Sequence, residues 1–193
     1  GASGKGGLDI NAQQLDDLIN GGAHAAAELG FGYHEDLPHI ESNGRLTTEH
    51  ASISQRARER GLRALGTLGS GNHFLELQTV GKTVDANTAE AWGLYEGQLV
   101  AMIHSGSRGL GHQVCSDHVR ALEGRYKSRG STWVEEEWGY TLTDRQLASA
   151  PFHSKEGQAY YDAMNAAANF AFANRSALAH RLREVLRLEL GVD

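Results

Sequence analysis

The chain has 193 residues, of which 40% are hydrophobic and 22% are charged, an ordinary composition for one globular domain with a sizeable core. Its net charge of −6 argues against a general polyanion-binding surface, so any contact with nucleic acid requires a local basic patch. The only cysteine, Cys115, excludes an internal disulfide framework and, with no apolar run of membrane-spanning length, predicts a cytoplasmic protein without a membrane partner.

The first third of the chain is predicted to form two helices around a loop. Apolar residues recur at helical spacing over residues 11–29, and Gly30 is placed to end that helix. Residues 32–44 are typical of a loop, and residues 54–65 are typical of a second helix. This second helix carries the densest positive cluster of the chain, made of Arg56, Arg58, Arg60 and Arg63. Such a cluster is commonly a solvated helix face.

Two predicted strands follow, and a glycine-rich loop with a histidine adjoins each of them. Residues 74–80 alternate as a strand after His73, and an apolar run over residues 99–103 stops at His104. A short helix over residues 87–94 separates the strands. Antiparallel pairing would bring the two imidazoles to one edge of the sheet, whereas parallel pairing would separate them by about 20 Å. Only the antiparallel arrangement makes a shared site possible.

The rest of the chain is predicted to be mainly helical. One helix covers residues 111–126 after the second glycine loop, and a long helix from about residue 156 to residue 190 carries alanines suited to close packing. The stretch between them is expected to be irregular, with Glu135 to Glu137 in a solvated loop, and Cys115 is expected to be buried. Helices combined with an antiparallel or mixed sheet indicate the α+β class.

The two glycine loops concentrate the residues that could carry chemistry. Glycines beside a histidine can satisfy turn geometry, and they also expose backbone N–H groups that suit anionic oxygens. By itself, a histidine at a strand end is more often hydrogen-bonded or exposed than bound to metal. Arg108 and the backbone of residues 105–111 lie just before a predicted helix, so together they are expected to form an anion site.

Four segments of the chain resemble the RtcB family of RNA ligases. The two most specific are LGSGNHFLE over residues 68–76 and HSGSRGLGHQ over residues 104–113. SQR at residues 54–56 and AAANFAFANR at residues 166–175 support them. The resemblance implies that residues 1–193 are the central part of a single RtcB-like catalytic domain, truncated at both ends, with a sheet flanked by helices as part of the larger fold.

The family joins RNA 3′-phosphate or 2′,3′-cyclic phosphate ends to 5′-hydroxyl ends, using GTP and two Mn²⁺ ions, in tRNA splicing and RNA repair. By resemblance, His73 and His104 are metal ligands that share one site, which predicts that they lie at one edge of an antiparallel sheet. Arg108 and Asn72 are, by resemblance, catalytic residues that contact phosphate. The segment expected to bind GTP or GMP consists of Asn72, His73, Phe74, Leu75 and Glu76. The resemblance also implies RNA as substrate, either tRNA halves or broken ends, and an archease-type activating protein as partner. The arginine cluster then becomes a candidate RNA contact.

The family's catalytic set is only partly present in this sequence. The family also uses an Asp-x-x-Cys motif, a third metal-binding histidine and a further histidine that becomes guanylylated. No Asp-x-x-Cys occurs here, and Cys115 follows the second motif, so it does not match the metal-bridging thiolate. We therefore expect the isolated chain to be inactive.

Two alternatives stay open at this point. The chain could be a non-catalytic fragment that keeps a metal or anion site. It could also belong to an unrelated metal-dependent hydrolase with two histidines, in which a carboxylate such as Asp117 or Glu76 would complete the metal ligands.

Overall fold

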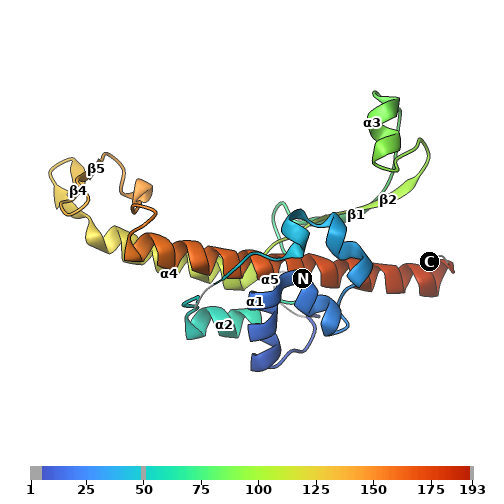
Figure 1. Cartoon of the computed structure of the whole chain (residues 1–193), viewed down its shortest axis with the longest axis horizontal. Coiled ribbons are helices and arrows are strands. Elements are labelled where there is room, and N and C mark those ends of the chain that lie inside the picture. Colours follow the sequence, from blue (N-terminus) through green and yellow to red (C-terminus); the bar gives the residue numbers. More distant parts are fainter. Residues whose placement is uncertain (1–5, 49–50, 192–193) are drawn as a thin grey trace.

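The computed structural model describes residues 6–48 and 51–191, and its longest element is a helix of 36 residues that runs along the molecule (Figure 1). This helix, α5, is about 54 Å long at the standard rise per residue. In chain order the elements are α1 (Ala12–Glu28), η1 (His34–His39), η2 (Glu41–Gly44), α2 (Gln55–Gly61), β1 (Phe74–Thr79), α3 (Ala86–Ala91), β2 (Leu99–His104), α4 (Arg108–Arg125), β3 (Lys127–Arg129), β4 (Thr132–Glu135), β5 (Tyr140–Leu142), η3 (Arg145–Leu147) and α5 (Lys155–Leu190). The fold is α+β, as the sequence predicted.

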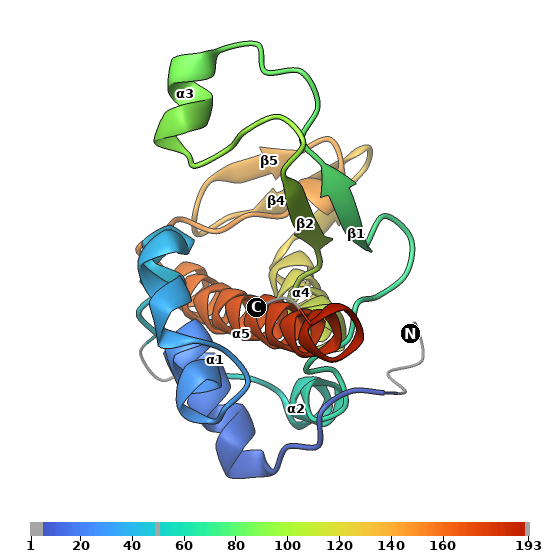
Figure 2. The same cartoon turned by 90° about the vertical axis from the view of Figure 1, so that its right-hand side faces the viewer.

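The main hydrophobic core lies between helices. Viewed along α5, helices α1 and α2 lie on one side of it and strands β1 and β2 lie on the other (Figure 2). The largest fully buried apolar side chains of this core are Leu15, Leu18, Leu65, Leu110 and Phe170. Asn11 begins α1 with a capping box, in which its side chain and that of Gln14 each accept a backbone N–H of the other residue. Several alanines of α5 are buried in this core and permit close helix packing, namely Ala163, Ala166, Ala167, Ala173 and Ala177.

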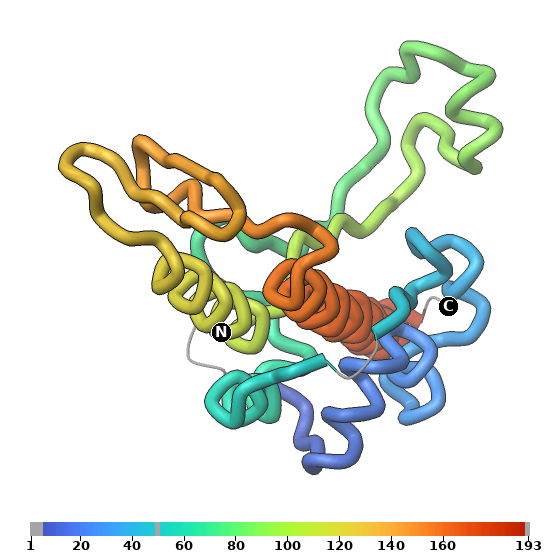
Figure 3. The backbone as a smooth tube through the Cα atoms, turned by 60° about the vertical axis from the view of Figure 1, so that its left-hand side comes forward, coloured from blue at the N-terminus to red at the C-terminus, as the bar shows by residue number. Residues whose placement is uncertain are grey.

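Strands β1 and β2 form an antiparallel two-stranded sheet in which Phe74 pairs with His104 and Thr79 pairs with Leu99. This confirms the predicted pairing. The sheet projects from the helical body as an arm, with α3 at its tip (Figures 1 and 3). None of the residues of β1, α3 or β2 is buried. The helical core therefore does not extend into the arm.

A second sheet, with strand order β3-β4-β5, occupies the stretch that was predicted to be irregular. The strands have only three or four residues, too few for a hydrophobic alternation to be visible in the sequence. A two-residue turn between Arg129 and Thr132 contains Gly130 at φ 67°, and the β4–β5 connection contains Gly139 at φ 69°. The Gly-Ser pair of the first turn is a hairpin signal that could have revealed this sheet.

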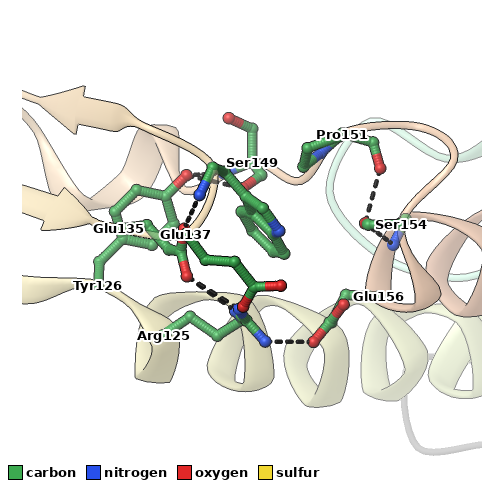
Figure 4. Close-up of polar contacts among 10 residues, drawn as sticks. Arg125, Tyr126, Glu135, Glu137, Ser149, Pro151, Ser154 and Glu156 are labelled. Carbon is green, nitrogen blue, oxygen red and sulfur yellow. Dashed lines mark hydrogen bonds and ion pairs between the residues drawn. The ribbon is translucent and has the colours of Figure 1, made fainter.

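Arg125, in the last turn of α4, ties the second sheet to the helices (Figure 4). Its guanidinium group forms ion pairs with Glu135, Glu137 and Glu156 and stacks 4.3 Å from the ring centroid of Trp138. The hydrogen bonds that Arg125 donates to Glu135 and, second in size of effect, to Glu137 raise the pKa of Arg125 further above its ordinary value. A single arginine thus connects α4, β4 and the start of α5.

The expectation that Glu135 to Glu137 form a solvated loop is wrong for Glu135. Its side chain is buried, accepts the backbone N–H of Trp138 at 2.6 Å and pairs with Arg125 at 2.8 Å. Burial alone would raise the pKa of Glu135, but these hydrogen bonds outweigh it and lower the pKa below its ordinary value. A run of acidic residues does not show which member faces an arginine that lies ten positions earlier.

Three further differences from the sequence predictions are local. Helix α4 begins at Arg108 and not at Gly111, because the N–H of Gly111 already bonds the carbonyl of Ser107 at 3.3 Å. The predicted loop over residues 32–44 contains the short helices η1 and η2. Cys115 is exposed, because it lies outside the buried stripe of α4 that includes Leu110 and Val114.

In the described ranges, no helix is both long and apolar enough to cross a membrane.

Candidate metal and phosphate site

The two motif histidines lie together at the base of the arm. The β1–β2 register places His104 opposite Phe74, the first residue of β1, and His73 directly precedes Phe74. The ring centroids of His73 and His104 are 5.9 Å apart, with 35° between the ring planes. The prediction that both imidazoles share one edge of the sheet is confirmed, and the distance allows them to bind one ion or two neighbouring ions.

The surroundings of each histidine orient its ring. His73 Nδ1 lies 2.7 Å from the carbonyl oxygen of Ser70. Because a carbonyl oxygen only accepts, Nδ1 carries the hydrogen, and in the neutral ring the lone pair is on Nε2. This is the usual arrangement of a metal-binding histidine, whose second nitrogen is held by a hydrogen bond. The ring of His104 packs edge-on against Phe74, with centroids 5.3 Å apart.

The side chain of Arg108, which belongs to the second glycine loop, reaches the start of the first glycine loop. Its Nε donates to Thr67 Oγ1 at 3.3 Å, and burial lowers the pKa of its guanidinium group below the ordinary value. Its backbone has φ 52°, in the left-handed region that a residue with a side chain enters at a cost of about 1–2 kcal/mol. A strained backbone at an arginine on the first turn of a helix supports a functional role for that residue.

Gly69 makes the close approach of His73 and Arg108 possible. Its φ is +125°, and a Cβ atom there would lie 2.7 Å from Cζ of Arg108 and 2.8 Å from Cγ of His73. No side chain fits in that space without moving one of these two groups. The first glycine loop therefore brings an imidazole and a guanidinium group together on either side of a bare backbone.

The residues present fit part of a metal site. The two imidazoles suit a divalent transition metal, but within residues 6–48 and 51–191 no group of three or more His, Cys, Asp or Glu side chains is arranged to hold an ion. Asp117 accepts hydrogen bonds from Ser54 and Gln113, and Glu76 accepts one from Gln78. The hydrolase alternative, which needs one of these carboxylates as a ligand, therefore gains no support from the geometry.

Part of the segment predicted to bind GTP or GMP, residues 72–76, lies around the two histidines. Phe74 contacts His104, and Glu76 follows on the same face of β1 because side chains alternate along a strand. Leu75 is on the opposite face, where it pairs with Ile103. Asn72 is exposed in the turn before β1. The roles of these residues in nucleotide binding stay predictions.

Sequence reasoning missed the roles of two polar side chains, Thr67 and Ser105, and named Arg60 only as a member of the basic cluster. Thr67 and Ser105 are buried polar residues, and Ser105 Oγ donates to the carbonyl of Leu68 at 2.6 Å, which joins the two loops. Arg60, from the basic cluster, packs on the Arg108 loop, since a Cβ atom at Gly109 would lie 3.0 Å from its Nε. The available signal was the presence of hydroxyl residues inside both glycine motifs, where buried polar groups need partners.

Phosphate or sulfate is expected to bind at Arg108 and the backbone of residues 105–111. The first N–H groups of α4 and the planar guanidinium group both suit an anionic oxygen. Arg108→Lys should weaken phosphate binding by about tenfold, because the ammonium group of lysine cannot form the two parallel hydrogen bonds that a planar guanidinium group donates to phosphate. Phosphate titration followed by NMR measures this. The control is Arg129→Lys, on the exposed strand β3. Equal phosphate affinity in wild type and Arg108→Lys would contradict the assignment.

Comparison with known proteins agrees with the family resemblance of the sequence motifs. The family model described as tRNA-splicing ligase RtcB matches residues 1–193. The chain is 47% identical over 185 residues to tRNA-splicing ligase RtcB of Thermococcus kodakarensis, which covers 95% of this chain and 36% of that protein. It is 45% identical over 194 residues to the protein of the same name from Archaeoglobus fulgidus, covering 100% of the chain and 38% of the relative. The chain therefore spans well under half the length of these curated relatives.

Proposed function

Since the chain belongs to the tRNA-splicing ligase RtcB family, we propose that it is part of a longer RNA ligase that joins 3′-phosphate or 2′,3′-cyclic phosphate ends to 5′-hydroxyl ends with GTP and Mn²⁺. The observation that carries the proposal is the pair of histidines 5.9 Å apart, with Arg108 beside His73 across Gly69. The groups proposed to bind metal and the group proposed to bind phosphate thus lie close together.

His73 and His104 are the residues of this chain that would hold metal. When bound, Mn²⁺ would supply Lewis acidity and positive charge next to a phosphate group. Hydrogen bonding of Nδ1 to Ser70 keeps Nε2 of His73 free, so that ring needs no rearrangement before it binds. The remaining ligands and the guanylylated histidine would come from other parts of the longer protein.

Arg108 would bind and orient an RNA phosphate. Its partly buried guanidinium group already touches Thr67, so few rotamers are left to lose when an anion binds. Arg60 adds a second positive charge next to the same loop. Arg58, by contrast, is paired with Asp16, so only part of the arginine cluster is available to RNA. A local basic surface of this kind allows RNA binding in a chain of net charge −6.

The segment from Asn72 to Glu76 would contact the guanylate of GTP or GMP. The alternation of β1 gives Phe74 and Glu76 to the face that carries His104, which is the face nearest the proposed metal site. Asn72 could donate an amide hydrogen bond to a phosphate oxygen. By family resemblance the same protein would act in the cytoplasm on tRNA halves or broken RNA, with an archease-type activating partner.

The test is RNA joining by the full-length protein that contains this segment. Arg108→Lys is expected to lower the joining rate by about 10- to 100-fold, the kinetic equivalent of losing one charge-assisted hydrogen bond. Arg129→Lys serves as the matched control. Unchanged joining by Arg108→Lys would reject the role of Arg108, and no joining by the wild-type protein with GTP and Mn²⁺ would reject the proposed function.

The same assay distinguishes the proposed RNA ligase from the alternative of a non-catalytic fragment. A fragment that only binds metal or anions would keep phosphate binding at Arg108, but the longer protein would not join RNA ends. Phosphate binding by the isolated chain and RNA joining by the longer protein are therefore measured independently.

A further inference from the structure

Two asparagines on α5, Asn169 and Asn174, are completely buried in a helix that is otherwise rich in alanine. A buried amide that lacks partners is destabilising, so each of these residues has to satisfy its hydrogen bonds internally. Asn169 and Asn174 do so in the same way but with different parts of the chain. The difference between them points to a role for Asn174 that neither the sequence motifs nor the family comparison assigns.

Asn174 contacts both glycine loops at once. Its Oδ1 accepts the backbone N–H of Thr67 at 3.2 Å, and its Nδ2 lies 3.1 Å from the carbonyl of the same residue. Nδ2 also lies 3.0 Å from the carbonyl of Gly106 and 3.2 Å from Ser105 Oγ. Thr67 precedes Gly69 by two residues, and Gly106 follows His104 by two residues. One amide group therefore connects the backbone leading to His73 with the backbone between His104 and Arg108.

This connection lies where the strand pairing has ended. The β1–β2 register stops at Phe74 opposite His104, so the ladder does not hold the loops beyond that pair. Nor does the arm bury any residue of its two strands. The relative position of the loops therefore depends on side-chain contacts from α5, together with the bonds from Ser105 to Leu68 and from Arg108 to Thr67. Arg175 adds one more contact, from its Nη1 to the carbonyl of Ser105 at 3.1 Å.

We propose that Asn174 is a positioning residue that sets the distance between the two glycine loops and thereby keeps His73, His104 and Arg108 together. The meaning of that site for metal and phosphate rests on the proposed function, whereas the positioning itself rests on the hydrogen bonds. Only an amide fits, because the group must accept one N–H and donate to carbonyl oxygens. Aspartate has nearly the same shape but cannot donate when ionised.

Asn169 provides a matched control. Its Oδ1 accepts the backbone N–H of Leu46 at 2.7 Å, and its Nδ2 donates to the carbonyl of Leu46 at 2.9 Å and of Ile19 at 3.0 Å. It is as buried as Asn174 and lies five residues earlier on the same helix. Its partners belong to α1 and to the chain after η2, and not to the glycine loops. Asn169→Asp should thus cost folding stability without acting on the site.

The experiment compares Asn174→Asp with Asn169→Asp in the complete 193-residue chain. Denaturant unfolding reports the stability of each variant, and NMR reports the ring resonances of His73 and His104. Ni²⁺ is the metal probe, because two imidazoles hold it more tightly than Mn²⁺. We expect both variants to lose stability. Only Asn174→Asp should shift both ring resonances and weaken Ni²⁺ binding, by about 10-fold or more, as is typical when the support of a metal ligand is removed.

A second variant covers the case in which Asn174→Asp does not fold. Ser105→Ala removes one partner of Asn174 and the bond to Leu68, but leaves the buried amide in place. It should change the same histidine resonances and weaken Ni²⁺ binding by a smaller factor.

Two outcomes would overturn the positioning role. One is that neither Asn174→Asp nor Ser105→Ala changes the histidine resonances, and the other is that Asn169→Asp changes them to the same extent. If wild type does not bind Ni²⁺, the proposed metal site fails, and the ring resonances alone still decide the role of Asn174.

Discussion

Radiolabelled GTP, incubated with the purified chain and Mn²⁺, is expected to leave no label on the protein after separation under denaturing conditions. His73 and His104 are proposed as metal ligands, and by resemblance the guanylylated histidine belongs to a later segment that matches no part of this chain. Without that nucleophile the covalent route is lost completely, and not merely slowed. The isolated chain should also fail to join RNA ends.

The control for this experiment is the full-length protein, which should retain the label under the same conditions. Label that remains on the isolated chain and disappears when one of its histidines is replaced would contradict the prediction. It would show that this segment contains its own nucleophile. Replacement of His73 and His104, one at a time, would then show whether a residue assigned here to metal binding performs that role.

Gly69→Ala is expected to abolish phosphate binding at Arg108 and to displace the ring of His73. Alanine at φ +125° has a strained backbone, which is destabilising by about 1–3 kcal/mol. Its Cβ atom would also overlap the guanidinium group of Arg108 and the imidazole of His73. The helical core lies elsewhere, so the variant should remain folded. Phosphate titration and the NMR resonances of the His73 ring measure the effect.

Gly71→Ala is the matched control for this prediction. Gly71 also has a positive φ, +71°, but a Cβ atom there meets nothing within 4 Å, so this variant carries backbone strain without the steric overlap. If Gly69→Ala binds phosphate as well as Gly71→Ala does, the close packing of His73 and Arg108 around residue 69 is not important for the site.

The two strands of the arm were predictable because their information is local, and their antiparallel pairing was predicted because the family resemblance places both histidines at one site. Strand β1 begins directly after His73 and β2 ends at His104, and the connection between them, which contains α3, returns the chain so that Phe74 pairs with His104. The long helix was equally clear from its alanine content and its spacing. The second sheet was not, because its short strands depend on turns at Gly130 and Gly139 and on the anchoring of Glu135 by Arg125.

The sequence by itself determined the α+β class, the positions of the two histidine strands and the family, because motifs and periodicity are properties of neighbouring residues. Only the tertiary structure decided that Cys115 is exposed, that Glu135 is buried and that Asn174 joins the two glycine loops. These outcomes depend on which helix face meets which loop across separations of up to 107 residues along the chain. Spacing along the chain cannot encode such contacts, since they arise when separate elements pack together: Asn174 joins α5 to Thr67, and Glu135 joins β4 to α4.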